Sequence, residues 1–262
     1  MDYNSIIYEK KSSIAKITLN KPDAGNTLDL QLAKELYSAS LNAASDDNIK
    51  ALILTANGKL FCGGGNLKFL LSNKKEVKKI LLEMTMYFHG AISRMARMNA
   101  PVIVGVNGTA GGGGFSLAIT GDIIYAVKDA KFTLAYTNAG LSPDGSSTYY
   151  LPRIVGMKKA KELMLTNRLF SAEEAHDMGL IDLVFNSNIE LNEAINKQAE
   201  VFSKGPINAY KSVKKLLSES FNNGLESQME AESIHISNNA ESKDGIEGIT
   251  AFSEKRKPNF NE

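Results

Sequence analysis

The sequence predicts an α/β fold with a buried, largely parallel sheet, followed by a helical last third. Two observations lead to this fold class. Up to about Val184, short apolar runs typical of buried strands alternate with longer segments of helical periodicity. Beyond Val184 the apolar residues recur only at helical spacing. The length of 262 residues, at about 150 residues per domain, leaves room for one core and one appendage.

Four strands and two long helices are expected in the first part of the chain. They are the strands Ser13–Leu19, Ala51–Thr55, Val102–Val106 and Ile123–Ala126 and the helices Asp29–Ser45 and Lys75–Met98. In the second helix, apolar residues from Val77 to Met95 recur every three or four positions, and lysines occupy the other side near its start. That helix should therefore pack through one inner face.

The last third is predicted to consist of helices without a sheet of their own. Pro206, the Asn222-Asn223-Gly224 cluster and Ser242 as a possible N-cap separate three helices from a fourth that ends near Phe252. These helices must therefore pack on the α/β core or on another subunit.

The composition excludes several classes of protein. The formal net charge is +1, so the whole molecule lacks the electrostatic attraction that a nucleic-acid or anionic-membrane binder needs. Cys62 is the only cysteine and the three histidines are scattered, so neither a disulfide nor a structural metal site is expected. The first residues show no apolar stretch of signal-peptide length. We expect a cytoplasmic protein without a metal.

Two glycine clusters, Gly63–Gly65 and Gly111–Gly114, follow strands of the predicted sheet. Neither has the spacing of a dinucleotide-binding turn or the Lys-Ser/Thr of a phosphate loop, so no nucleotide cofactor is expected. Glycines in such turns can present bare backbone N–H groups to an oxygen that becomes negative, and each such donor lowers a reaction barrier by about 2.7–4 kcal/mol. The alternative is that they only permit tight turns and close packing.

Ordered motifs along nearly the whole chain carry a resemblance to a known family. They are Leu19-Asn20-Lys21-Pro22, Phe61-Cys62-Gly63-Gly64-Gly65-Asn66-Leu67, the run from Asn107-Gly108 to Gly114, Gly121-Asp122-Ile123, Leu151-Pro152-Arg153-Ile154-Val155-Gly156 and Phe252-Ser253-Glu254-Lys255. With these motifs the chain resembles the enoyl-CoA hydratase/isomerase, or crotonase, superfamily.

The resemblance implies a crotonase-like spiral of ββα units and a helical C-terminal region that mediates trimerisation, often as a dimer of trimers. Residues 1–200 would form the acyl-CoA-binding core and residues 201–262 the helical region. The substrate would be an acyl-CoA thioester, with no separate cofactor because the CoA is part of the substrate. By position, the backbone N–H groups of Gly65 and Gly113 would stabilise the thioester enolate.

The carboxylates indicate which reaction to expect. The hydratases of this family hold a water between two glutamates, and the corresponding positions here resemble Ser116 and Tyr136. Neither side chain is a carboxylate base. The loss of one general acid or base lowers the rate of a reaction by about 10²–10⁴-fold. Efficient hydration is therefore not expected.

A different acid, Asp144, follows Ser142-Pro143 and precedes Gly145. The segment resembles a branch of the family with a single acidic residue here, which includes Δ3-Δ2-enoyl-CoA isomerases and the isomerase of epoxidised phenylacetyl-CoA. One carboxylate within reach of C2 and C4 would remove a proton from the first carbon and return one to the second. The alternatives are that the segment is a surface turn or that Asp144 caps a helix.

The resemblance also implies substrate contacts at Ala24, Gly63, Leu67, Ser116, Tyr136 and Lys255. Ala24 would meet the adenine and Lys255 a phosphate of CoA, although solvated tail charge is an equally good interpretation of Lys255.

Two further interpretations concern side chains near the expected site. His89 lies beside the apolar stripe of its helix and is expected to be a satisfied side chain rather than a base. Residues 152–168 also resemble the 4-chlorobenzoyl-CoA dehalogenases, in which an aspartate at the place of Asp144 is the nucleophile. Their tryptophan corresponds to Tyr136, and their histidine base is expected to be replaced by Ser93. The dehalogenase reaction would then be severely impaired.

Three functional hypotheses remain. The first is an enoyl-CoA isomerase, of the Δ3-Δ2 or the ring type, that uses Gly65, Gly113 and Asp144. The second is an enoyl-CoA hydratase whose water is held by Asp144 and Ser116. The third is a non-catalytic acyl-CoA-binding protein.

Overall fold

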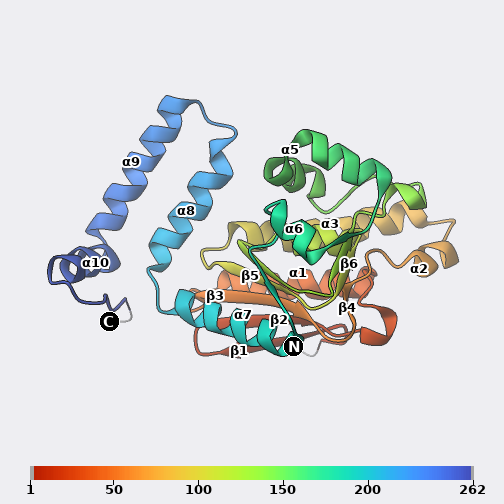
Figure 1. The fold of residues 1–262 in the computed structure, drawn as a ribbon, viewed down its shortest axis with the longest axis horizontal. Helices are drawn as coiled ribbons and strands as arrows, with labels where there is room; N and C mark the ends of the chain where they lie inside the picture. The colour runs from red at the N-terminus through yellow and green to blue at the C-terminus, as the bar shows by residue number, and fades with distance from the viewer. Residues whose placement is uncertain (1–2, 261–262) are drawn as a thin grey trace.

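Six strands form the main sheet of the computed structural model, which describes residues 3–260, and they lie in the order β1-β2-β3-β5-β7-β10 (Figure 1). They are β1 (Ile6–Lys11), β2 (Ile14–Leu19), β3 (Ala51–Ala56), β5 (Val102–Val106), β7 (Ile123–Val127) and β10 (Leu183–Phe185). β1 runs antiparallel to β2, and the other neighbouring pairs are parallel. The four predicted strands are β2, β3, β5 and β7, so the expected parallel sheet is confirmed.

A second, smaller sheet has the order β4-β6-β8-β9. Its strands are β4 (Leu60–Cys62), β6 (Thr109–Gly111), β8 (Lys131–Thr133) and β9 (Phe170–Ser171). The chain places β3, β5 and β7 in the main sheet and the strand that follows each of them in the small sheet, before it enters a helix. This repetition is the predicted spiral of ββα units.

Ten α-helices and two short 3₁₀ helices complete the described residues. They are η1 (Pro22–Ala24), α1 (Leu30–Ser45), α2 (Leu67–Ser72), α3 (Val77–Arg97), α4 (Gly113–Ala118), η2 (Thr137–Ala139), α5 (Ser147–Thr166), α6 (Ala172–Asp177), α7 (Asn188–Ser203), α8 (Ile207–Ser220), α9 (Leu225–Glu241) and α10 (Lys243–Ser253). Local sequence fixes several starts. The carboxylate of Asp29 accepts the N–H of Leu32 at 2.9 Å, and Ser242 caps α10 by accepting the N–H of Gly245 at 3.1 Å.

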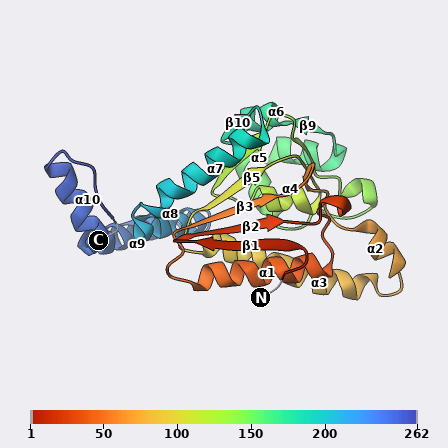
Figure 2. The ribbon, with the colours of Figure 1, turned by 90° about the horizontal axis from the view of Figure 1, so that it is seen from below.

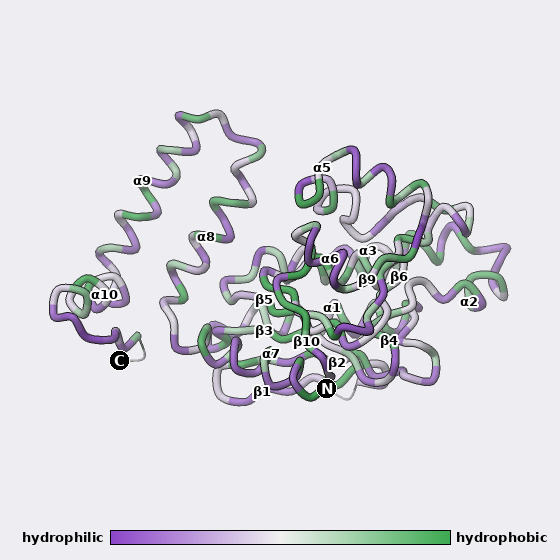
Figure 3. Tube along the Cα trace, in the orientation of Figure 1, coloured by the Kyte–Doolittle hydropathy of each residue, from purple (hydrophilic) through white to green (hydrophobic). Residues whose placement is uncertain are grey.

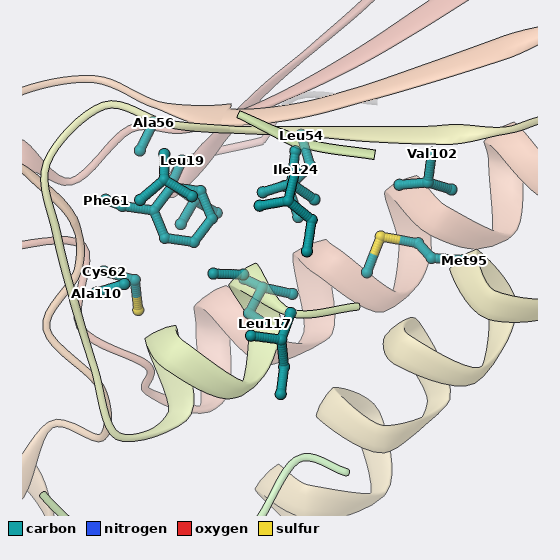
Figure 4. Packing of buried hydrophobic residues seen from close by; sticks show 14 of the residues in the cluster. Leu19, Leu54, Ala56, Phe61, Cys62, Met95, Val102, Ala110, Leu117 and Ile124 are labelled. Carbon is teal, nitrogen blue, oxygen red and sulfur yellow. The ribbon is translucent and has the colours of Figure 1, made fainter. Parts of the chain in front are cut away.

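The core lies between the main sheet and the helices on its two faces. α7 covers one face, and α1 and α3 lie on the other (Figure 2). β3 is buried along its whole length, as expected for a strand of a parallel sheet that is covered on both sides. Figure 4 shows side chains of β2, β3, β4, β7, α3 and α4 meeting in one apolar layer, among them Leu54, Leu117 and Met95.

The C-terminal helices α8, α9 and α10 form an arm that projects from the α/β part (Figure 1). Hydrophobic residues occur along this arm although the core does not cover it (Figure 3). α7 packs on β3 and β5 and runs across residue 200. The division into a core of residues 1–200 and a helical region of residues 201–262 stays a prediction. The role of the arm in trimerisation stays a prediction as well. Within residues 3–260, no helix combines the length and apolar character needed to span a bilayer.

Candidate active site

A mostly apolar pocket of about 280 Å³ lies between the glycine turns that follow β4 and β6, the helices α2 and α3, and the loop before α5. Gly65 and Gly113 from the two predicted glycine turns line it, together with Asp144 from the loop before α5. Its apolar wall includes Leu28, Leu67, Leu70, Leu81, Met84 and Phe88. The fold therefore brings three residues that are far apart in the sequence to one cavity, as their motifs predicted.

The turn after β4 exposes the backbone N–H of Gly65 to this pocket. The turn is pinned to Leu28, whose N–H donates to the carbonyl of Gly64 at 2.7 Å and whose carbonyl accepts the N–H of Asn66 at 2.8 Å. Both bonds use the neighbours of Gly65, so its own amide points away from Leu28. Among the described residues 3–260 this N–H has no acceptor. A side chain at Gly65 would meet nothing within 4 Å, which places the position at open space.

Gly113 begins α4, so its N–H has no acceptor within that helix. Gly112 before it has φ +51°, a left-handed conformation that favours glycine. Gly114 after it would place a Cβ 2.1 Å from the carbonyl oxygen of Cys62. Glycine at these positions thus lets α4 approach β4 closely, and that approach holds the N–H of Gly113 at the pocket.

Asp144 presents a carboxylate that is neither fully buried nor fully solvated, with its side chain 36% exposed. Its Oδ1 lies 2.7 Å from Nε2 of His89 on α3. Burial raises the pKa of Asp144, but the hydrogen bond and charge of His89 and the N–H of Gly145 outweigh burial and hold the pKa below its ordinary value of 3.8. Asp144 is therefore ionised at neutral pH and can accept a proton.

His89 is the direct hydrogen-bond partner of Asp144, so its side chain is satisfied as expected, but the sequence did not identify this partner. The bond to Asp144 raises the pKa of His89 above 6.5, although partial burial opposes the shift. The dehalogenase histidine base was expected to be replaced by Ser93, and it is His89, one turn earlier on the same helix, that contacts this carboxylate. One feature of the sequence could have pointed to this contact. His89 is a titratable side chain that directly follows the buried Phe88 on α3.

Ser116 and Tyr136 lie together, but their hydroxyl groups hold the main chain of Asp144. The Ser116 hydroxyl donates to the carbonyl oxygen of Asp144 at 2.7 Å and lies 2.8 Å from the hydroxyl of Tyr136. The Tyr136 hydroxyl is also 3.2 Å from the same carbonyl oxygen. Ser116 is fully buried, and burial raises the pKa of Tyr136 above its ordinary value. The two positions thus support the loop that carries Asp144.

The other expected substrate contacts divide into two groups. Gly63 and Leu67 line the pocket, and the N–H of Gly63 donates to the carbonyl of Gly25, which follows Ala24, at 2.9 Å. The exposed Ala24 thus lies next to the glycine turn. Lys255 follows α10 at the far end of the arm (Figure 1), so a single chain does not bring it to the pocket.

Cys62 lies in the glycine turn but is buried. Burial raises the pKa of its thiol to about 12, so it stays protonated and is a poor nucleophile. Residues 3–260 contain no group of three or more His, Cys, Asp or Glu side chains that could hold a metal ion.

The family is shown by comparison with known proteins. The family model described as Enoyl-CoA hydratase/isomerase matches residues 9–262. The chain belongs to this family.

The relatives of this member of the enoyl-CoA hydratase/isomerase family carry different activities in their names. It is 33% identical over 260 residues to a probable enoyl-CoA hydratase of Rhodobacter capsulatus, and 99% of each chain is covered. It is 30% identical over 261 residues to the 1,2-epoxyphenylacetyl-CoA isomerase of Escherichia coli, with 97% of each covered. The crystal structure of an enoyl-CoA hydratase from Polaromonas sp. JS666 matches with a TM-score of 0.91 and 32% identity, over 97% of this chain and 99% of that one.

In an enoyl-CoA hydratase/isomerase family member, this arrangement can perform enolate chemistry. Gly65 and Gly113, whose amides have no acceptor among residues 3–260, line the same apolar cavity as the ionised carboxylate of Asp144. A thioester carbonyl that accepts both amides would acquire negative charge when a proton leaves the adjacent carbon, and amides fixed in advance stabilise that charge.

Proposed function

We propose that the chain is an acyl-CoA isomerase, which moves a double bond from C3 to C2 of an enoyl thioester or rearranges a ring-type phenylacetyl-CoA substrate. The observation that carries this proposal is the lone carboxylate of Asp144 in the pocket that Gly65 and Gly113 also line. By resemblance, Ser116 and Tyr136 occupy the positions of the two hydratase glutamates. Their hydroxyl groups form hydrogen bonds with the backbone carbonyl oxygen of Asp144.

The proposed reaction needs one base that acts twice. The N–H groups of Gly65 and Gly113 would polarise the thioester carbonyl, and Asp144 would remove a proton from C2. The resulting dienolate would be protonated at C4 by the same carboxyl group. Each donor in such an oxyanion hole contributes about 2.7–4 kcal/mol of transition-state stabilisation.

Enoyl-CoA hydration is the alternative within the same family. It would require Asp144 and Ser116 to hold a water. The donor hydrogen of Ser116 is directed at the carbonyl oxygen of Asp144, and its side chain is fully buried, so Ser116 is poorly placed for this role.

Hydrolytic displacement on an aromatic thioester is a second candidate, and the contact between His89 and Asp144 favours it. Asp144 would attack the ring carbon, and His89 would activate the water that releases the product. The position of the dehalogenase tryptophan is occupied here by Tyr136, which is engaged with Ser116. Halide release from a 4-halobenzoyl thioester would support this candidate over the isomerase.

The experiment that tests the proposal is a panel of thioesters assayed with the wild type and Asp144→Asn. We expect faster conversion of a 3-enoyl-CoA than hydration of crotonyl-CoA. We expect Asp144→Asn to keep CoA binding while isomerisation falls by about 10²–10⁴-fold, because the substituted amide cannot take up the proton. Asp177→Asn, at an exposed aspartate on α6, is the matched control and should be unchanged.

Each other outcome of the panel contradicts the isomerase. Faster hydration would favour the hydratase. An equally active Asp144→Asn would exclude Asp144 as the base. Thioester binding without turnover, unaffected by Asp144→Asn, would indicate the non-catalytic binding protein.

We also infer that the enzyme acts in the cytoplasm as a homotrimer or a dimer of trimers. The projecting arm of α8, α9 and α10 supports the oligomer, because residues 3–260 of one chain leave its apolar side chains exposed. A neighbouring copy would also be needed to bring a residue such as Lys255 toward a pocket.

A further inference from the structure

The hydrogen-bonded pair of Asp144 and His89 lies between two separate hollows, of which Asp144 lines one and His89 the other. One is the acyl pocket described above. The other, which we call the outer groove, has a volume of about 350 Å³ and is lined by residues of α3, including His89 and Ser93, and by Tyr149 and Tyr150 of α5. The consecutive residues Phe88 and His89 line the pocket and the outer groove respectively. α3 therefore forms part of the wall between the two hollows.

His89 connects Asp144 to the outer groove. Its Nε2 is 2.7 Å from Oδ1 of Asp144, while its side chain remains 51% exposed. An ionised carboxylate only accepts hydrogen bonds, so Nε2 carries a hydrogen in the resting pair and Nδ1 is the other site on the ring for proton exchange. Among the described residues that line the outer groove, the other titratable groups are Tyr149 and Tyr150. Burial raises the pKa of Tyr150, so this phenol stays neutral.

We propose that His89 exchanges the proton held by Asp144 with solvent water through the outer groove. This inference rests on the proposed enolate chemistry at Asp144. It assigns His89 a role that acts through Asp144 and not on the substrate itself.

The reason for a separate route is that the acyl group would occupy the pocket side of Asp144. The side of His89, which faces the outer groove, would then remain open to water. Asp144 raises the pKa of His89, and His89 lowers the pKa of Asp144. Each side chain thus favours the charged form of the other, as expected for a pair that shares a proton.

The proton balance of the exchange is simple. One proton leaves C2 for Asp144, and the pair then holds one additional proton, either as a neutral carboxyl group and neutral imidazole or as a carboxylate and imidazolium. His89 gives one proton to water and takes one from water. Asp144 then delivers a proton to C4. One C–H bond breaks and one forms, with no oxidation or reduction.

The experiment is conversion of a 3-enoyl-CoA in D₂O, with the deuterium content of the product measured by mass spectrometry and NMR. We expect wild-type product to carry deuterium at C4. In His89→Gln the amide can still donate to Asp144, but it does not titrate and so cannot relay a proton between Asp144 and water. We expect the ratio of deuterated to undeuterated product to fall about 10²-fold, the lower end of the effect of losing an acid–base group. The ratio is measured per turnover, so it does not depend on the overall rate.

A histidine beside another carboxylate provides the matched control. His176→Gln on α6 removes a half-exposed histidine whose Nδ1 lies 3.8 Å from Asp177, away from the pocket. It should give the wild-type ratio. The inference is overturned if wild-type product carries no deuterium, or if His89→Gln gives as much deuterium per turnover as the wild type.

A saturated acyl-CoA separates this inference from the proposed function. Exchange of its C2 hydrogens with D₂O requires only enolate formation at Asp144 and no movement of a double bond. If no 3-enoyl-CoA is isomerised but the wild type exchanges C2 hydrogens and His89→Gln does so about 10²-fold more slowly, the isomerase is wrong and the role of His89 stands. Equal exchange by both proteins, or none by the wild type, rejects that role.

Discussion

At the scale of single residues, the two ends of Asp144 have separate partners. The backbone carbonyl oxygen is held by the hydroxyl groups of Ser116 and Ser147, at 2.7 and 2.9 Å. The carboxylate is held by His89 at 2.7 Å. The main-chain bonds fix where the residue lies, while the side chain remains able to gain and lose a proton. A catalytic base needs both properties, because it must be held in position before the substrate binds and must still be able to accept a proton.

Gly145, next to Asp144, is the residue at which a small change should displace this base. Its φ of +61° favours glycine, and a Cβ would lie 2.6 Å from Cε1 of Phe88 and 2.8 Å from Cβ of Ser116. Gly140→Ala is the matched control, because Gly140 has φ +70° but a Cβ there would meet nothing within 4 Å. We expect Gly140→Ala to lower the free energy of unfolding by about 1–2 kcal/mol from backbone strain alone.

Gly145→Ala should lower the free energy of unfolding by roughly 3 kcal/mol, because overpacking against Phe88 and Ser116 is added to the strain. Urea denaturation measures both variants, and the isomerisation rate should fall only in Gly145→Ala. Equal losses of stability in the two variants would show that the contacts around Gly145 relax without cost.

The sequence pointed to some residues that line the pocket and not to others, for physical reasons. Asp144, Gly65 and Gly113 belong to turns with unusual local sequences, so motif and chemistry pointed to them together. His89 belongs to a helix whose periodicity reports only which face is buried. Its partner is 55 positions away in the sequence, and no local pattern encodes such a pairing. The same holds for Ser116 and Tyr136, whose hydroxyl groups serve the backbone of a third residue.

At the scale of secondary-structure elements, long apolar patterns were predicted closely and short ones were missed. Val102–Val106 was predicted with its observed bounds, and the helix expected at Lys75–Met98 spans Val77–Arg97. The resemblance implied ββα units, but the individual strands of the small sheet were not predicted, because strands of two or three residues such as Thr109–Gly111 are too short to show alternation. β4, β6 and β8 each follow a strand of the main sheet and pair in parallel with one another, while β9 follows α5 and pairs antiparallel with β8.

One buried cation fastens the arm to the core. Nζ of Lys214 on α8 lies 2.6 Å from Oδ2 of Asp122 and donates to the carbonyl oxygens of Met95 and Ala100 at 3.2 and 3.1 Å. Only 10% of this side chain is exposed, and burial lowers the pKa of Lys214 although Asp122 opposes the shift. The amine thus joins α8 to the end of α3 and to the start of β7.

Lys214→Met should detach α8 without altering the pocket. We expect the free energy of unfolding to fall by about 2 kcal/mol, less than the roughly 3–5 kcal/mol typical of a broken buried pair, because Asp122 stays partly solvated. Hydrogen exchange should speed up in α8 and not in β3 or β5. Lys215→Met, at an exposed position of the same helix, is the control. Unchanged exchange in α8 would show that its apolar contacts alone hold the arm.

At the scale of the whole molecule, the apolar side chains of the α/β core are buried, whereas many of those on the arm are exposed. α8, α9 and α10 pack on one another, yet apolar side chains remain exposed on all three, including Leu217, Leu225, Ile249 and Phe252. An open groove of about 800 Å³ separates α8 from the core and is lined by Tyr149, Ile154 and Phe221 among others. Contiguous exposed apolar surface of this kind marks a place where another protein packs. Copies of the same chain are the partner that we propose for the arm.

The oligomer is tested most directly by mass in solution. Sedimentation equilibrium should give about three or six times the 28.5 kDa of one chain. Phe252 is 88% exposed at the end of α10, so Phe252→Asp should place a charge in the contact and shift the mass toward one chain, because an unpaired charge buried at an interface is costly. Ile189→Asp, at an exposed apolar position on α7, is the control and should keep the wild-type mass. A wild type that sediments as a single chain would rule out the oligomer, and the exposed apolar face of the arm would then need another partner.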